Sequence, residues 1–240
     1  MASTRQLPWL RICAESAAIV ASILLAFWID VWWDKTQESA LASEYEIRIA
    51  LELHSNLEQL NSQLAHVERN LLAASEVAGF FDVVRQPVGG EQLIVNLYNM
   101  GRDPSDKFDV STYEDLIATG RLALILNIQL RQAIQRAYSE IRALEPILRP
   151  NRQEYLTGLR GWIPNTVIEK IRESCPSMSS APCPDATIDI DAQTINDTVK
   201  RFTSEDALLA YRLREQGLYE KEGRTLQAIS AVEEAIALLD

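Results

Sequence analysis

The sequence has few of the residues on which most catalytic and metal sites depend. Its 240 residues include two histidines, three cysteines, nine glycines and nine prolines. It contains no paired-cysteine zinc motif, glycine-rich phosphate loop, Gly-x-Ser-x-Gly elbow or Glu-x-x-His pair. His54 and His66 are twelve residues apart, which separates them by about 18 Å on a helix. They cannot hold one metal ion within one chain, so we expect neither a cofactor nor an enzyme.

Clusters of basic residues are missing as well. The net charge is −11, and the first 33 residues are neutral, so the acidic excess belongs to the rest of the chain. Such a surface repels phosphate backbones, and we expect no nucleic-acid partner. Neighbouring carboxylates point in different directions on a helix, which favours solvated faces over a carboxylate metal site. These pairs are Glu114–Asp115, Glu205–Asp206 and Glu233–Glu234.

One segment near the N-terminus has the features of a membrane span. Residues 16–29 carry no charge, but as a helix they reach only about 21 Å of a hydrocarbon layer of roughly 30 Å. Tryptophans flank this run on both sides, like the aromatic belts of membrane helices. These interface anchors are Trp9, Trp28, Trp32 and Trp33. We therefore predict a transmembrane helix over residues 10–33, in contact with the lipid bilayer.

A cleaved secretory signal is the main alternative to an anchor that stays attached. Bulky residues follow Leu25 where a small-x-small cleavage site would be needed, which favours a signal anchor. Arg5 and Arg11 precede the span, and acidic residues dominate after it. The positive-inside rule then places residues 1–9 in the cytoplasm and residues 34–240 in the periplasm, as one domain on a bacterial inner membrane.

Two features inside the predicted span leave alternatives open. Glu15 either pairs with Arg11, one helical turn earlier, or has a buried role in partner binding or proton sensing. A strip of small residues recurs every four positions and either mediates self-association or reflects ordinary composition. The strip consists of Ala14, Ala18, Ser22 and Ala26.

Two of the cysteines bear on the cellular compartment in which the domain lies. Cys175 and Cys183 enclose a loop with two prolines and three serines. A disulfide between them would restrict the unfolded chain by roughly 2–3 kcal/mol and persist only in an oxidising compartment. The alternative is two unpaired surface thiols. Cys13 is expected to be a small apolar residue within the span.

Three stripes of apolar residues at spacings of three and four predict long helices with matching faces. The first stripe is Leu53, Leu57, Leu60, Leu64, Val67, Leu71, Ala74 and Ala78. The second is Leu130, Ile134, Ala137, Ile141, Leu144 and Leu148, and the third is Leu226, Ile229, Val232, Ile236 and Leu239. We predict an all-α fold in which the transmembrane helix continues into an elongated antiparallel bundle. An intramolecular core is favoured over an intermolecular coiled coil.

Local signals predict where the helices begin and end. Ser111 with Glu114 forms a capping box for a short helix that Gly120 would end in a left-handed conformation. Asn127 would cap the next helix, and Ser204, or Thr203 with Asp206, would start the C-terminal one. Residues 86–90, 101–108 and 175–203 are predicted to be loops.

Two stretches resemble a bacterial family of unknown function. Residues 14–35 (AESAAIVASILLAFWIDVWWDK) resemble its opening, a Glu-headed apolar segment that ends in a polar-x-Trp pair. Residues 112–138 (TYEDLIATGRLALILNIQLRQAIQRAY) share its order of a Tyr, a Leu, a small-Gly pair and an Asn-x-x-Leu-Arg. Asp30 and the doubled Trp32–Trp33 depart from the family pattern. The resemblance implies one span and a helical domain, and it brings no activity or ligand.

These observations favour a membrane-anchored interaction or scaffold protein that binds itself or another envelope protein. An extracytoplasmic ligand sensor that signals through a partner is the alternative. A carboxylate-metal hydrolase is a third, less favoured hypothesis.

Overall fold

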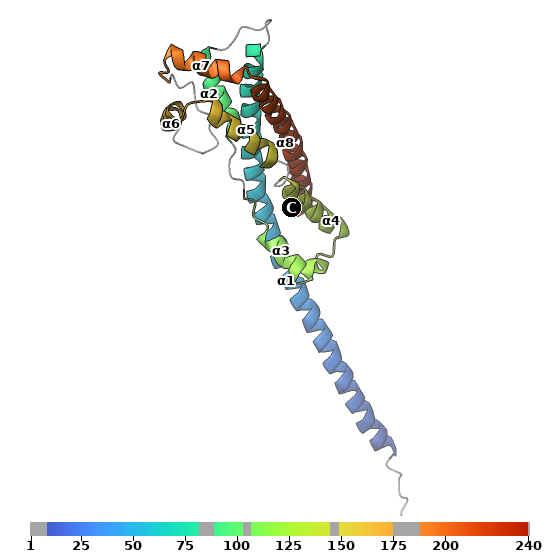
Figure 1. Ribbon diagram of the computed structural model, residues 1–240. Coiled ribbons are helices and arrows are strands. Elements are labelled where there is room, and N and C mark those ends of the chain that lie inside the picture. Colours follow the sequence, from blue (N-terminus) through green and yellow to red (C-terminus); the bar gives the residue numbers. More distant parts are fainter. Residues whose placement is uncertain (1–8, 82–88, 103–106, 145–148, 175–187, 240) are drawn as a thin grey trace, which may run out of the picture.

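The computed structural model describes residues 9–81, 89–102, 107–144, 149–174 and 188–239, and the protein is all-α, as predicted (Figure 1). No strand occurs within these ranges. The elements in chain order are α1 (Trp9–Phe81), α2 (Gly90–Gly101), α3 (Ser111–Ala118), the 3-10 helix η1 (Arg121–Leu124), α4 (Ile128–Ala143), α5 (Arg149–Trp162), α6 (Asn165–Ser174), α7 (Ala192–Phe202) and α8 (Glu205–Ala237).

Helix α1 is a single unbroken helix of 73 residues, which gives it a length of about 110 Å. Its sequence contains no proline, and its one glycine is Gly79 near the end, so nothing interrupts the backbone hydrogen bonds. The first part of α1 projects alone from the rest of the molecule (Figure 1). Side chains 13–40 are all exposed, and packing begins at Leu41 and Tyr45. The first helix therefore continues from the apolar stretch into the domain, as expected.

Helices α1 and α8 form the long axis of the domain and run antiparallel, side by side (Figure 1). The beginning of α8 packs near the end of α1, and the end of α8 packs near residues 45–60 of α1. Helix α4 lies against the second half of α8, whereas α2 and α5 cover the region where α1 ends and α8 begins. The bundle is thus made within one chain.

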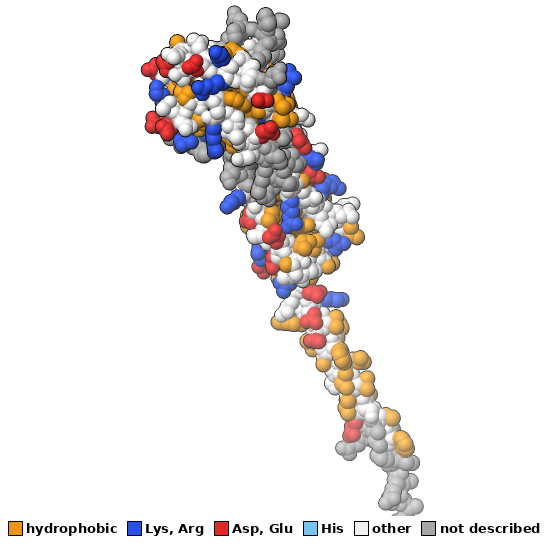
Figure 2. Space-filling view, viewed as in Figure 1, with side chains coloured by type: hydrophobic (Ala, Val, Ile, Leu, Met, Phe, Trp, Pro, Cys, Tyr) orange, Lys and Arg blue, Asp and Glu red, His pale blue; other side chains and the backbone are white. Residues whose placement is uncertain are grey.

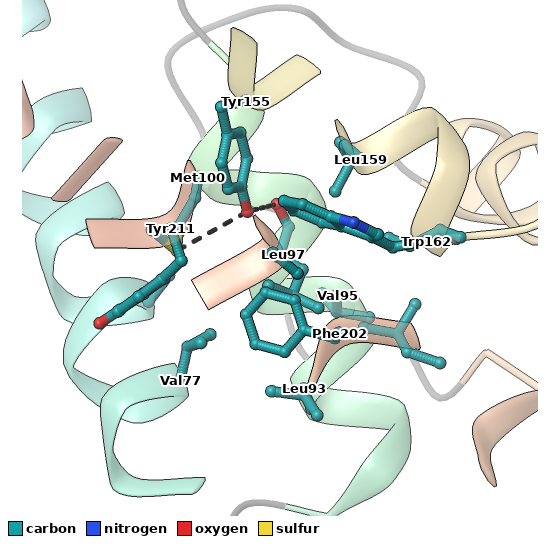
Figure 3. Packing of buried hydrophobic residues seen from close by; sticks show 14 of the residues in the cluster. Val77, Leu93, Val95, Leu97, Met100, Tyr155, Leu159, Trp162, Phe202 and Tyr211 are labelled. Atoms are coloured by element: carbon teal, nitrogen blue, oxygen red, sulfur yellow. Dashed lines mark hydrogen bonds between the residues drawn. The ribbon is translucent and has the colours of Figure 1, made fainter. Parts of the chain in front are cut away.

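The core divides into two clusters along this axis. We call the one nearer the projecting part of α1 the proximal cluster; it joins residues 45–60 of α1 to α3, α4 and the end of α8. The distal cluster joins residues 73–77 of α1 to α2, α5, α6, α7 and the start of α8. Figure 3 shows the distal cluster, where Trp162 contacts Phe202 edge to face with ring centroids 5.4 Å apart. The hydroxyl of Tyr155 donates to the carbonyl of Leu97 over 2.8 Å.

The predicted apolar stripes mostly coincide with these buried faces. In the first stripe every residue is buried or half-buried, and in the second every described residue is buried; Leu148 lies outside the described residues. The third stripe is wrong at Leu226, which is 49% exposed. Thr225 and Ala228 are buried instead, because the buried face of α8 turns gradually around the helix as its partner changes from α5 to α4.

Two predicted caps are confirmed, together with the predicted turn glycine. The Asn127 side chain accepts from the amides of Gln129 and Leu130, and Ser204 accepts from the amide of Ala207. Gly120 has a φ of +69°, which places it in the left-handed region that favours glycine.

The capping box at Ser111 is wrong. Val110 is the N-cap of α3, and Ser111 is the first helical residue. The amide of Ser111 donates to the Asp109 carboxylate over 3.0 Å, and this bond lowers the pKa of Asp109. Glu114 instead forms a salt bridge of 3.1 Å with Arg142. Ser111 has no capping role because acceptors from Asp109 and from α1 already satisfy the start of this helix.

The predicted loop over residues 175–203 is also corrected, because α7 occupies Ala192–Phe202. Asp191 caps this helix by accepting from the amide of Thr194 over 2.8 Å. Ile195, Val199 and Phe202 face the distal cluster at spacings of four and three. The apolar residues of α7 are few and separated by polar ones. The helix therefore depends on packing of these residues against the distal cluster.

Candidate functional site

The segment predicted to span a membrane is the exposed, projecting part of α1. Among the described helices, α1 is the one that is long and apolar enough to cross a membrane, judged by length and composition. Its most apolar window has a mean hydropathy of 1.8, and none of that window is buried. Figure 2 shows apolar side chains along this projection, in contrast to the charged surface of the domain. We call residues 13–33 the apolar segment.

The four predicted interface tryptophans are all exposed. Trp9 is the first residue of α1, and Trp33 follows 24 residues later on the same helix, so the two are about 36 Å apart along the axis. Trp28 and Trp32 lie one turn apart on one face. The distances from Trp9 to Trp28, Trp32 and Trp33, about 28 to 36 Å along the axis, are close to the roughly 30 Å of a hydrocarbon core, as expected for aromatic belts at both interfaces.

The small residues of the apolar segment lie along one face of an exposed helix. Within the described part of the chain, Ala14, Ala18, Ser22 and Ala26 are all exposed. The Ser22 hydroxyl donates to the carbonyl of Ala18 over 2.8 Å, so its polarity is satisfied inside the helix. Arg11's side chain lies outside the described residues, and its pairing with Glu15 stays a prediction. Cys13 is exposed on the same segment.

The other candidate groups do not gather into one site. The ring of exposed His54 contacts the carbonyl of Ala50 over 2.8 Å, whereas His66 is buried. Glu234 pairs with Arg136 over 2.6 Å on the surface. Over the described part of the chain, no three His, Cys, Asp or Glu side chains come together as metal ligands would. Cys175 and Cys183 lie outside the described residues.

A row of buried polar residues lies on α1 beside the first apolar stripe, and the sequence-based expectations did not include it. The row consists of Glu52, Asn56, Gln63, His66 and Asn70. They follow one another at intervals of four, seven, three and four, which keeps them on one helical face. This polar row at helical spacing is the signal that could have predicted them.

The two ends of this row hold the connection between α2 and α3 against α1. Asn56 donates to the carbonyl of Asp109 over 2.6 Å and accepts from its amide over 2.9 Å. Farther along, the His66 ring and the Asn70 amide contact the carbonyl of Arg102 over 3.1 and 3.0 Å. The row therefore holds Arg102, directly after α2, and Asp109, shortly before α3, against the longest helix.

A small cavity lies at the His66 end of the row, between α1 and the end of α2. Its volume is about 20 Å³. Residues 66, 69 and 70 of α1 share a face, and Arg102, the C-cap of α2, follows Asn99 by three positions. The lining residues are His66, Arg69, Asn70, Asn99 and Arg102. The cavity lies between the two core clusters, because residues 66–70 follow the proximal part of α1 and precede its distal part.

Two arginines and two asparagines are among the residues that line this cavity. Nε and Nη2 of Arg69 are buried and have no hydrogen-bond partner, and Oδ1 of Asn99 is in the same situation. A buried polar atom without a partner costs roughly 1–3 kcal/mol. Burial lowers the pKa of Arg69, the nearby charge of Glu68 opposes this shift, and the positive charge of Arg102 adds to it. An arginine still carries its charge at neutral pH, and the carboxylate of Glu68 is near enough to Arg69 to oppose that charge.

No known protein family, curated protein or solved structure matches this chain.

Proposed function

We propose that this protein is a membrane-anchored helical scaffold of the bacterial envelope that binds a second copy of itself or another envelope protein. In this proposal residues 10–33 cross the inner membrane, residues 1–9 are cytoplasmic, and residues 34–240 form a periplasmic domain. The observation that carries the proposal is the exposed apolar segment, which continues without a break into a packed bundle.

The cost of exposing this segment to water supports a lipid environment. Leaving a large aliphatic or aromatic side chain in water forfeits roughly 1.5–3 kcal/mol relative to burial. The apolar segment exposes Ile19, Val20, Ile23, Leu24, Leu25, Phe27, Trp28, Ile29, Val31, Trp32 and Trp33. No other part of the described chain covers them, so lipid or another protein must do so.

The geometry of α1 supports a scaffold role. Between Trp33 and the first fully buried residue, Tyr45, the helix adds about 18 Å. Because α1 is unbroken over this distance, the domain would be carried on a stiff helical stalk above the membrane surface. The resemblance of residues 14–35 and 112–138 to a family with one span and a helical domain agrees with this arrangement.

Reporter fusions test the topology directly. A reporter active only in an oxidising compartment, placed after residue 40 or at the C-terminus, is expected to be active, and a cytoplasmic reporter at the same sites to be inactive. Thiol blocking of Cys175 and Cys183 before and after reduction is expected to detect a disulfide. Recovery of the intact chain in the soluble fraction, or of a mature form starting after Trp33, would contradict the proposal.

The scaffold role needs a second test. Cross-linking in cells is expected to capture a second copy or an envelope partner. If the strip of small residues is the contact between two copies, Ala18→Leu is expected to weaken self-association. Val20→Leu, on the opposite face of the helix, is expected to leave self-association unchanged. A full-length protein that is a monomer in mild detergent, combined with no captured partner in cells, would rule the scaffold role out.

A further inference from the structure

The turn between α3 and α4 exposes apolar side chains where a helix start usually covers them. Leu126 is 85% exposed, more than any other large apolar side chain in the described part of the chain, and Ile128 is 59% exposed. Leu126 directly precedes Asn127, the N-cap of α4. An apolar residue at that position often packs on the residue four places after the cap, but here that residue is Arg131.

This turn is held in place by hydrogen bonds and by its glycine. The side chain of Asn127 caps α4, and Nη1 of Arg131 donates to the carbonyl of Ile125 over 3.3 Å. Gly120 adopts the left-handed conformation earlier in the turn. The exposure of the apolar side chains is therefore a property of a defined conformation. We call residues 117–131 the apolar turn.

The charge of the apolar turn is opposite to that of the chain as a whole. Residues 116–139 contain three arginines and no acidic residue, in a chain with a net charge of −11. Arg136 pairs with Glu234, whereas Arg121 and Arg131 belong to the apolar turn itself. Exposed apolar side chains next to arginines are typical of surfaces that contact anionic lipid headgroups.

The apolar turn lies at the end of the domain from which the apolar segment projects. The hydroxyl of Tyr45 donates to the Asp115 carboxylate over 2.7 Å and accepts from Nη1 of Arg121 over 3.1 Å, which ties α3 and η1 to the first packed part of α1. Figure 1 shows α3 next to the point where α1 leaves the domain. Apolar side chains are visible on the surface of this end of the domain (Figure 2).

The geometry of α1 allows this end of the domain to reach the headgroups. Leu41 is the first residue of α1 that packs against the proximal cluster, and it lies about 12 Å beyond Trp33 along the axis. Transmembrane helices tilt by up to about 40°, and a tilt of about 30–40° reduces this height to about 9–10 Å. An element packed on the lower side, about 8–10 Å from the axis, lies roughly 4–6 Å lower still. The headgroup layer is about 5–8 Å thick.

We propose that the apolar turn is a second membrane contact, in which Leu126 and Ile128 enter the headgroup layer and α1 tilts toward this side. The proposal rests on the proposed function, because it requires the apolar segment to cross the bilayer. A lipid surface is favoured over a second copy of the chain. Two copies related by a two-fold axis would bring the same arginines of both turns together.

Photo-cross-linking of the full-length chain in liposomes tests the contact. The apolar photoprobe p-benzoylphenylalanine replaces Leu126, Leu24 or Leu72, three leucines that are all more than half exposed. The liposomes contain equal parts of phosphatidylcholine and phosphatidylglycerol, and mass spectrometry identifies the adducts. Phospholipid adducts are expected at Leu126 and Leu24. Only background is expected at Leu72, which lies about 40 Å beyond Tyr45 on α1.

The contribution of charge is measured with the probe kept at Leu126. Arg131→Gln is expected to lower the yield of lipid adducts roughly two- to fivefold in the mixed liposomes, as expected for one arginine near an anionic surface. In liposomes of phosphatidylcholine alone the same substitution is expected to have no effect, which separates charge from a change in folding. Arg160→Gln, at an exposed position of α5, is the matched control and is expected to leave the yield unchanged in both.

The outcomes distinguish this contact from the anchor. Lipid adducts at Leu24 without any at Leu126 would refute the second contact and leave the anchor standing. Absence of lipid adducts at Leu24 would contradict the anchor, and the second contact would fall with it. Adducts between Leu126 and a second copy of the chain, or equal lipid yields at Leu126 and Leu72, would also overturn the proposal.

Discussion

The carboxylate of Glu52, in the middle of α1, accepts a hydrogen bond of 2.7 Å from the backbone amide of Thr112 in the first turn of α3. The same carboxylate accepts from the hydroxyl of Tyr138 on α4. A residue sixty positions away therefore does what a local N-cap normally does, and it ties three helices together. The ring of Tyr138 also stacks on that of Tyr113, with centroids 4.3 Å apart.

Replacing Glu52 is expected to weaken the whole domain. Glu52→Ala leaves the amide of Thr112 and the hydroxyl of Tyr138 buried without an acceptor, which costs about 2–4 kcal/mol in the free energy of unfolding. Urea unfolding of the full-length protein in mild detergent, followed by far-UV circular dichroism, measures this loss. Glu58→Ala, an exposed position on the same helix, is the control. Equal unfolding curves for the two variants would contradict this role of Glu52.

Two leucines of α1 with equal exposure test whether the apolar segment lies in lipid. Leu24 is 63% exposed and Leu72 is 62% exposed, but only Leu24 belongs to the apolar segment. An arginine near the centre of a span costs roughly 2.5–3.5 kcal/mol, whereas an arginine in water costs almost nothing. Leu24→Arg is expected to lower the fraction of protein that resists alkaline extraction from membranes. Leu72→Arg is expected to leave that fraction unchanged, and the same behaviour of both variants would argue against insertion.

Two glycines with open surroundings are expected to respond in opposite directions to alanine. Neither Gly120 nor Gly223 would bring an added Cβ within 4 Å of another group, so only the backbone differs. Gly120 has a positive φ, and Gly120→Ala is expected to destabilise the protein by about 1–2 kcal/mol. Gly223 lies inside α8, and Gly223→Ala is expected to stabilise it by about 0.5–1 kcal/mol. Thermal unfolding compares the two, and a stabilising Gly120→Ala would contradict the left-handed turn.

Buried tyrosines make the protein sensitive to alkali. Burial raises the pKa of Tyr138, Tyr155 and Tyr211 well above the ordinary value near 10. Unfolded tyrosines ionise near that ordinary value, so the contribution of these groups to stability is complete below pH 10 and is lost as the pH rises above it. We expect tyrosinate absorbance of these groups to appear together with the loss of helical circular dichroism. Ionisation of every tyrosine in a still helical protein would contradict their burial.

Much of the fold could be predicted because its determinants are local. Leu53, Leu60 and Val67 recur at helical spacing, and they are fully buried, as the pattern indicates. Asn127 and Gly120 also act within one turn of their own position. The failures at Ser111, Leu226 and α7 have a common cause, because each depends on which other helix lies against that position.

The candidate cavity could not be predicted from local patterns. Arg69 and Arg102 are 33 positions apart, and each alone has the appearance of a solvated surface residue. They line one cavity because α2 packs back against α1. His66 similarly looks like an isolated histidine until its ring meets the carbonyl of Arg102.

Composition and helical periodicity act over a few residues, so they were enough to predict that the chain is helical and that one segment is apolar enough for a membrane. The positions of Glu52 at the start of a distant helix and of two arginines at one cavity follow only from the packing of the helices. Such contacts depend on how helices pack after the chain has folded back on itself, and no short stretch of sequence carries that information.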